Sequence, residues 1–182
     1  MLKKYALLAI IAFPLLFSCS EDPVAKAEKE ATASSKEFFQ WYLKNKKELL
    51  EKRKAIVFVD EGGFNAVNMF KIDDYVSFLK KSGKFSEDFI QKEKEYWLGE
   101  CLDVIFEMQE KGVKGDPAVF PCKFNENPFY LTPKEFTQES ISTMNFQSDS
   151  ISLENASLKY GNHSLKLKNK NGSWKVMDWA SK

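Results

Sequence analysis

The sequence predicts an α+β fold, with N-terminal helices packed on a curved C-terminal antiparallel sheet. Apolar residues recur at helical spacing up to about residue 111, whereas from about Glu139 they alternate with polar residues. Helices followed by a run of strands are typical of this class. The chain of 182 residues includes 16 phenylalanines, and this aromatic content indicates a packed core rather than a disordered stalk.

The first helix is predicted over residues 35–51. Ser34 and Glu37 have the spacing of a capping box, which marks the N-terminus of a helix. Lysines and glutamates then occupy one side of the helix, which indicates a solvent-facing surface. The opposite, apolar face carries Phe38, Trp41, Tyr42, Leu49 and Leu50.

Two further helices are predicted before the strands begin. A short helix covers about residues 73–81, with an aspartate at its start and Gly83 at its end. The longest helix follows the cap residue Ser86 and runs to about Lys111, and Gly99 is a point where it can bend. Its apolar stripe consists of Ile90, Trp97, Cys101, Val104, Ile105 and Met108.

Strands are predicted in the last part of the chain, where the hydrophobic period is two. A change of inward-facing parity near Asn155 predicts a β-bulge or a break. Asn171-Gly172 is a turn signal between alternating strands. Upstream, Ile56–Val59 is a short β-branched run that fits a strand or a buried loop. The four predicted C-terminal runs cover residues 141–146, 151–160, 164–168 and 174–179.

The N-terminus has the features of a secretory signal. Two lysines precede the apolar run Tyr5–Phe17, whose 13 or so residues are fewer than the roughly 20 that a membrane-spanning helix needs. Leu16–Cys19 resembles the lipobox of bacterial lipoproteins, in which the cysteine thiol takes a diacylglycerol and the chain is cut before it. The resemblance implies a lipoprotein signal peptide over residues 1–18 and lipid attachment at Cys19. The alternative is an ordinary cleaved signal with an incidental cysteine.

Residues 19–34 are predicted to form a flexible tether, and residues 35–182 a single domain. The tether is rich in Ala, Lys, Glu and Ser and shows no apolar periodicity. Its start, Ser20–Asp22, resembles the tag of surface-exposed lipoproteins in Bacteroidetes-type bacteria, although it is equally compatible with a solvated linker. The predicted location is therefore the bacterial outer membrane, with the lipid-anchored domain facing the periplasm or the cell surface.

The charge balance gives no sign of a nucleic-acid partner. The formal net charge of +1 includes two lysines of the predicted signal, so the mature chain is close to neutral. No basic stripe and no acidic block stands out in the sequence. The predicted partners are the membrane, through the N-terminal lipid, and a protein or a small molecule.

Cys101 and Cys122 are the two cysteines of the predicted domain. An even pair in an exported chain predicts a disulfide, and closing a loop of about 20 residues would stabilise the fold by about 3 kcal/mol. Two buried free thiols are the alternative. The single histidine, His163, is expected at the surface, and one histidine excludes His-rich metal sites. No metal and no cofactor is predicted.

Three short segments carry a resemblance to a known fold: Phe38–Leu43, Asn127–Tyr130 and Gly172–Val176. They are similar to the cystatin-like, or nuclear-transport-factor-like, cone fold. More narrowly, they resemble an uncharacterised lipoprotein family of that fold, a domain of unknown function, in Bacteroidetes-type bacteria. The family usually has Asp where Asn127 stands, and its Gln-Asp pair is missing here. The resemblance covers most of residues 35–182 and implies a fold rather than an activity.

The aromatic faces of the predicted helices fit either a ligand pocket or an ordinary core. The candidate pocket residues are Phe38, Trp41, Tyr42, Tyr75 and Trp97. The leading hypothesis is a non-enzymatic binding module for a protein or a small ligand, with recognition by a pocket, a sheet face or a sheet edge.

Two alternatives to a binding module stay open. Enzymes of the ketosteroid-isomerase type resemble this fold and need a carboxylate base plus an oxyanion donor in an apolar cone. Tyr42 and Tyr75 could donate and Asp103 could be the base, although Asp103 falls on the polar side of its predicted helix. The other alternative is a structural or immunity-like envelope subunit. No residue is assigned a catalytic role.

Overall fold

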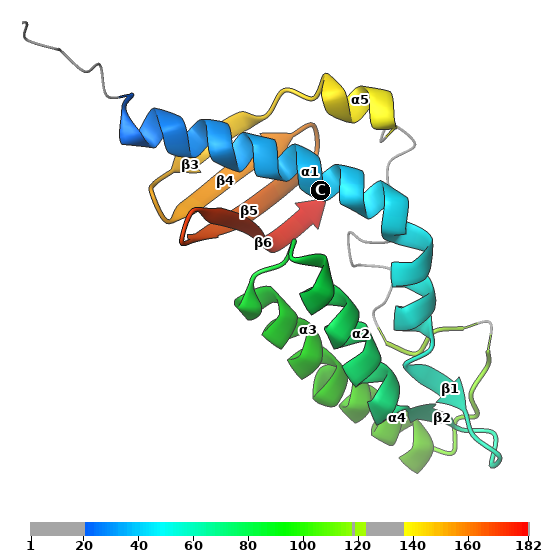
Figure 1. Ribbon diagram of the computed structural model, residues 1–182. Coiled ribbons are helices and arrows are strands. Elements are labelled where there is room, and N and C mark those ends of the chain that lie inside the picture. Colours follow the sequence, from blue (N-terminus) through cyan, green and yellow to red (C-terminus); the bar gives the residue numbers. More distant parts are fainter. Residues whose placement is uncertain (1–20, 118, 123–136, 182) are drawn as a thin grey trace, which may run out of the picture.

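Helices form the N-terminal part of the chain and an antiparallel sheet forms the C-terminal part, which confirms the predicted α+β class (Figure 1). The computed structural model describes residues 21–117, 119–122 and 137–181. The elements are α1 (Pro23–Lys54), β1 (Val57–Val59), β2 (Asn65–Val67), α2 (Met69–Ser82), α3 (Glu87–Leu98), α4 (Glu100–Glu110), α5 (Gln138–Ser142), β3 (Gln147–Ile151), β4 (Asn155–Tyr160), β5 (His163–Lys170) and β6 (Ser173–Ser181).

The main sheet has four strands in the order β3-β4-β5-β6, and each strand is antiparallel to its neighbours. Asn171 and Gly172 both have positive φ, 56° and 79°, and form the predicted turn between β5 and β6. The predicted run 151–160 is broken, because β3 ends at Ile151 and β4 begins at Asn155. The parity change in the sequence therefore marks a turn between two strands.

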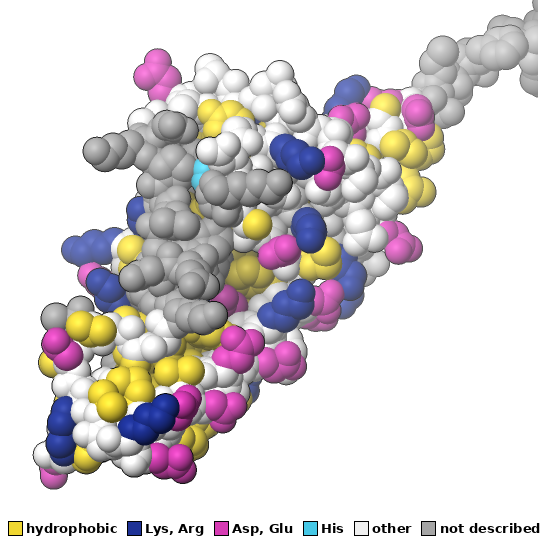
Figure 2. Space-filling model, turned by 180° about the vertical axis from the view of Figure 1, so that it is seen from behind, with side chains coloured by type: hydrophobic (Ala, Val, Ile, Leu, Met, Phe, Trp, Pro, Cys, Tyr) yellow, Lys and Arg dark blue, Asp and Glu magenta, His cyan; other side chains and the backbone are white. Residues whose placement is uncertain are grey.

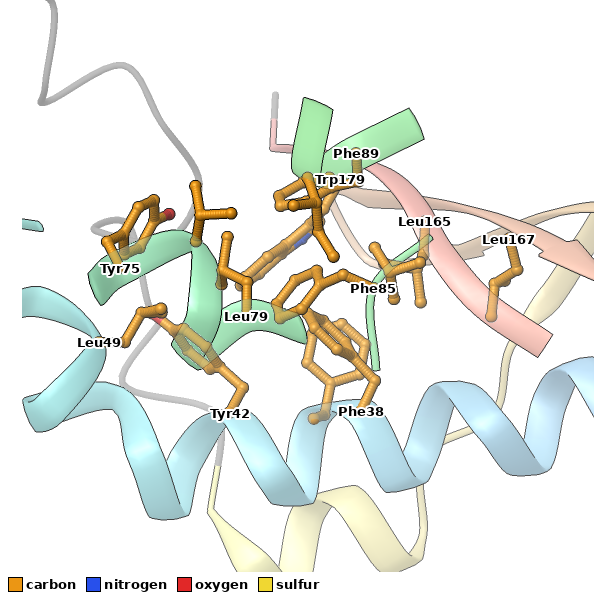
Figure 3. Packing of buried hydrophobic residues seen from close by; sticks show 14 of the residues in the cluster. Phe38, Tyr42, Leu49, Tyr75, Leu79, Phe85, Phe89, Leu165, Leu167 and Trp179 are labelled. Atoms are coloured by element: carbon orange, nitrogen blue, oxygen red, sulfur yellow. The ribbon is translucent and has the colours of Figure 1, made fainter. Parts of the chain in front are cut away.

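Helix α1 crosses one face of the main sheet and then continues alongside α2 (Figure 1). The other face of the sheet carries exposed lysines such as Lys159, Lys166 and Lys168. Between α1 and the sheet, the ring of Trp179 meets three aromatic rings of α1 edge to face, with centroid distances between 5.1 and 5.6 Å. The three partners of Trp179 are Phe38, Phe39 and Tyr42, and Figure 3 labels Trp179 together with Phe38 and Tyr42.

The start of α1 corrects the predicted tether. Asp22 caps the helix through its carboxylate, which accepts a 3.0 Å hydrogen bond from the backbone N–H of Val24, and Pro23 is the first helical residue. Residues 23–34 are thus helical, and Ser34 lies inside the helix rather than at its start. Ala27 and Ala31 are buried, so the apolar face begins earlier than the large side chains indicated.

Two helices stand where one long helix was predicted after Ser86. Gly99 separates α3 from α4 with φ −113° and ψ −94°. A Cβ atom at this position would lie 3.1 Å from the carbonyl oxygen of Glu95, so the close approach of the backbone suits glycine. Upstream, Asn68 caps α2, which therefore begins before the predicted aspartate cap, while Gly83 ends it as expected.

The predicted strand 141–146 is wrong, because its first residues belong to the short helix α5. Thr137 and Ser140 exchange reciprocal hydrogen bonds of 2.9 and 3.0 Å between side chain and backbone, and this capping fixes the first turn. Ile141 is fully buried. Local capping and one buried side chain outweigh the alternating pattern in this segment.

A second, two-stranded sheet lies at the opposite end of the molecule from the start of α1 (Figure 1). Strand β1 pairs with β2 and confirms that the run Ile56–Val59 contains a strand. Helix α4 supports this small sheet, because Gln109 Nε2 donates a 2.7 Å hydrogen bond to the carbonyl oxygen of Asn65 in β2. Figure 2 shows hydrophobic side chains gathered at this end. The exposed large ones on β1, α2 and α4 include Phe58, Met69, Phe70 and Phe106.

Cys101 and Cys122 form a disulfide in the structure, with Cα atoms 5.3 Å apart. Both residues are buried, and Cys101 lies in the first turn of α4. The bond holds the segment 119–122 against this helix. The loop that it closes is long enough for a stabilisation of about 3 kcal/mol in the chain-entropy model.

Phe38 and Phe70 provide a matched test of where the core lies. Phe38 is 1% exposed and Phe70 is 86% exposed, although both are helical phenylalanines. We expect Phe38→Ala to lower the free energy of unfolding by about 3–5 kcal/mol. The change Phe70→Ala should cost less than about 0.5 kcal/mol. Urea denaturation followed by circular dichroism measures both, and equal losses would contradict this packing.

Candidate functional site

The structure places the predicted pocket residues mainly in the core. Phe38, Tyr42, Tyr75 and Trp97 are fully buried, and Figure 3 shows the first three among the packed side chains. Trp41 is half-buried and lines a shallow surface groove together with Lys44 and Lys84 on the side of α1. Of the five residues, only Trp41 lines one of the three cavities considered for the described part of the chain.

A buried ion pair that was not predicted from the sequence lies beside this core. Arg53 is 2% exposed, and its Nη2 lies 3.6 Å from Glu93 Oε2. The same carboxylate accepts a 2.8 Å hydrogen bond from the hydroxyl of Tyr75. The guanidinium also lies 5.2 Å from the ring of Trp97. Arg53 follows Leu49 by four residues, so the helical spacing of the sequence already places Arg53 on the apolar face of α1.

The residues of the enzyme alternative do not converge. Tyr42 is fully buried and Tyr75 is bonded to Glu93, whereas Asp103 is exposed on α4. Asn127 and the predicted lipid site Cys19 lie outside the described residues. His163, expected at the surface, is only 7% exposed and its ring centroid lies 6.1 Å from that of Trp179. It is therefore a core residue at the start of β5.

A cavity forms where the first turn of α3 meets the edge of the main sheet. The α2–α3 connection pairs with β6: the N–H of Ser86 donates to Val176 O at 2.8 Å, and the N–H of Val176 donates to Lys84 O at 2.9 Å. Two cavities of about 620 and 280 Å³ lie beside this junction, and both are lined by Glu87, Asp88 and Lys175. Long-range backbone pairing thus creates the site.

We call the two adjoining cavities the α3 groove. Its lining residues are Val76, Lys80, Phe85, Ser86, Glu87, Asp88, Ile90, Gln91, Lys94, Lys168, Asn169, Lys170 and Lys175. Val76, Phe85 and Ile90 are buried and give the groove an apolar wall. The charged residues provide its polar part, so the groove combines both kinds of surface, as ligand sites commonly do.

Ion pairs hold several of the groove's charges in place. Lys168 Nζ lies 2.7 Å from Asp88 Oδ2, and Lys170 Nζ lies 3.2 Å from Glu87 Oε2. Both pairs join α3 to the end of β5, so they help to fix the helix on the sheet. Lys94 pairs with Asp73 at 3.7 Å. These pairs are exposed, and each stabilises the fold only weakly.

Lys168 also faces a like charge across the sheet, because it lies opposite Lys175 in the β5–β6 register. The hydrogen bond and the charge of Asp88 raise the pKa of Lys168. In turn, the hydrogen bond from Lys168 and then its charge lower the pKa of Asp88. Asp88 therefore stays ionised in mild acid and offsets the repulsion between the two lysines.

Comparisons of the chain with family models, curated proteins and solved structures found no match. Across the described ranges, no helix is long and apolar enough to cross a membrane. Within the same ranges, no three His, Cys, Asp or Glu side chains come together as metal ligands. The α3 groove is therefore the candidate functional site.

The Asp88–Lys168 pair makes the stability of the fold depend on pH. Because the folded-state pKa of Asp88 is lowered, the pair stabilises the fold above the ordinary aspartate pKa of about 3.9, and this contribution disappears as the pH falls through the folded-state value. We expect Lys168→Gln to raise the pKa of Asp88 toward its ordinary value. Carboxyl-detected NMR titration measures it. Lys159→Gln, outside the groove, is the control, and an unchanged pKa in Lys168→Gln would refute the assignment.

Proposed function

We propose that this chain is a lipid-anchored cell-envelope protein whose domain is a non-enzymatic binding module, with the α3 groove as its binding site. The observation that carries the proposal is the cavity of about 620 Å³ beside α3, with the buried side chains of Val76, Phe85 and Ile90 in its wall. The volume of this cavity lies in the range of small-molecule sites, and its wall combines three apolar side chains with six polar or charged ones.

The anchor part of the proposal is supported by the sequence. A basic start, a short apolar run and the lipobox-like segment Leu16–Cys19 follow one another in the order found in lipoprotein signals. The membrane partner is then the outer membrane, reached through acyl chains on Cys19, with the domain on the periplasmic or the outer side. Two or more acyl chains hold a protein stably, whereas one does so only marginally.

Binding is favoured over catalysis by the character of the groove's polar groups. Its carboxylates, Glu87 and Asp88, are each engaged by a lysine at 3.2 Å or less. A general base needs a carboxylate that is available to the substrate and a matched donor nearby. The tyrosines and the aspartate considered for an isomerase lie elsewhere in the fold.

The binding function can be tested by NMR titration of the mature chain, carrying Cys19→Ser so that no lipid attaches. Three probes with the same chain are used: octan-1-ol, octanoate and octylammonium. We expect at least one of them to give saturable amide shifts confined to groove residues. Gln91→Trp places a large ring at the groove wall and should weaken that binding about tenfold or more, because it occupies the cavity.

The control for Gln91→Trp is Lys92→Trp, an exposed position of the same helix that does not line the groove. It should leave the affinity unchanged. Absence of saturable shifts in the groove with all three probes would overturn the proposed function.

The anchor can be tested by substitution of Cys19. Cys19→Ala should leave the chain unprocessed or release it from the membrane fraction, since the thiol that takes the diacylglycerol is gone. Ser20→Ala, the neighbouring substitution, should fractionate as the unaltered protein does. Mass spectrometry of the membrane-bound protein should show a chain that begins at Cys19 and carries acyl groups. A membrane fraction that is unchanged in Cys19→Ala would contradict the anchor.

A further inference from the structure

The charges around the α3 groove are not balanced. Five lysines line the two cavities against only two carboxylates. Both carboxylates already pair with lysines of β5, and Lys94 pairs with Asp73 of α2. Lys80 and Lys175 have no carboxylate partner among residues 21–117, 119–122 and 137–181. The groove therefore holds two positive charges that the described part of the chain does not neutralise.

These two lysines lie next to the apolar wall of the groove. Lys80 follows Val76 by four residues on α2, so the two side chains share a helix face. Lys175 precedes Val176, and Val176 of β6 pairs with Phe85 in the α2–α3 connection. Both lysines line the larger cavity together with Val76, Phe85 and Ile90. Charge and apolar surface thus meet in one cavity.

We propose that the α3 groove binds an amphiphilic anion, a carboxylate or phosphate attached to an apolar chain. The inference rests on the proposed binding function and names the ligand class of the same site. An anionic head in this cavity gains attraction from both Lys80 and Lys175. The chain covers the part of the apolar wall that is still exposed and removes it from water. A neutral head lacks the first gain, and a cationic head adds repulsion.

The same three probes test the charge preference, since octanoate, octan-1-ol and octylammonium share one chain length. Octyl phosphate is added as the second anionic head, and acetate as a head without a chain. We expect octanoate and octyl phosphate to bind about tenfold more tightly than octan-1-ol, octylammonium to bind most weakly, and acetate to give no saturable shift. Raising the salt concentration should weaken the binding of the anionic probes and leave that of octan-1-ol unchanged, because salt screens the attraction between the anionic head and the lysines.

The substitutions then assign the preference to two residues. In Lys80→Gln/Lys175→Gln the affinity for octanoate should fall to that for octan-1-ol, and octan-1-ol binding should be unchanged. The matched control is Lys54→Gln/Lys71→Gln, which removes the same charge at exposed positions outside the groove. A control variant that loses octanoate binding equally would show a nonspecific charge effect and overturn the inference.

The outcomes separate the inference from the function on which it rests. Groove-confined binding of octan-1-ol or octylammonium that equals or exceeds octanoate binding overturns the anion preference and leaves the binding module standing. Loss of all groove binding overturns both. Vesicles of phosphatidylglycerol provide a separate test, in which the unlipidated chain is sedimented together with the vesicles. Co-sedimentation that is lost in Lys80→Gln/Lys175→Gln would show that a bilayer can present the anion. Binding of octyl phosphate without binding to the vesicles would indicate a free ligand.

Discussion

The contact between Trp179 and helix α1 is the interaction on which the arrangement of the whole domain depends. The indole of the last strand packs edge to face against Phe38, Phe39 and Tyr42 at 5.6, 5.5 and 5.1 Å. Such pairs contribute more than their buried area alone. They join the first element of the chain to the last, so neither the helical layer nor the sheet can bury its apolar face without the other. Phe85 extends the cluster, with its ring 5.7 Å from that of Phe38.

Strand β6 connects this core to the groove. Trp174, Val176 and Trp179 are buried, whereas Lys175 between the first two points to the other side and lines the groove. The backbone of Val176 also holds the α2–α3 connection in place. One strand therefore stabilises the core with some of its residues and shapes the site with another. A change that shifts the register of β6 would alter both at once.

Much of the fold was predictable because it rests on local signals. The turn at Asn171-Gly172 and the helix end at Gly83 need backbone conformations with positive φ, and both residue types adopt them readily. The early part of α1 was hidden because its buried face is made of Ala27 and Ala31, which match a polar linker in composition. Their burial depends on a sheet that lies far along the chain.

The groove could not be predicted for a related reason. Lys80 and Lys175 belong to a helix and to the last strand, and the backbone pairing of Phe85 with Val176 helps to bring those elements together. Neither lysine differs in its local sequence from the many solvated lysines of the chain. By contrast, the buried Arg53 did have a local signal, since it continues the apolar face that includes Leu49. A charged residue on an apolar helix face therefore indicates a buried ion pair already in the sequence, whereas a site formed between distant elements can be recognised only once the fold is known.

The position at which α1 begins sets how far the domain could stray from a lipid surface. Only three residues separate Cys19 from the first helical residue, Pro23, so the two Cα atoms lie at most about 14 Å apart even when the connection is fully extended. The 32 residues of α1 that follow form a helix with a contour length of about 48 Å. Because α1 packs on the domain from Ala27 onward, acyl chains on Cys19 would hold the start of α1 and the sheet beside it close to the bilayer.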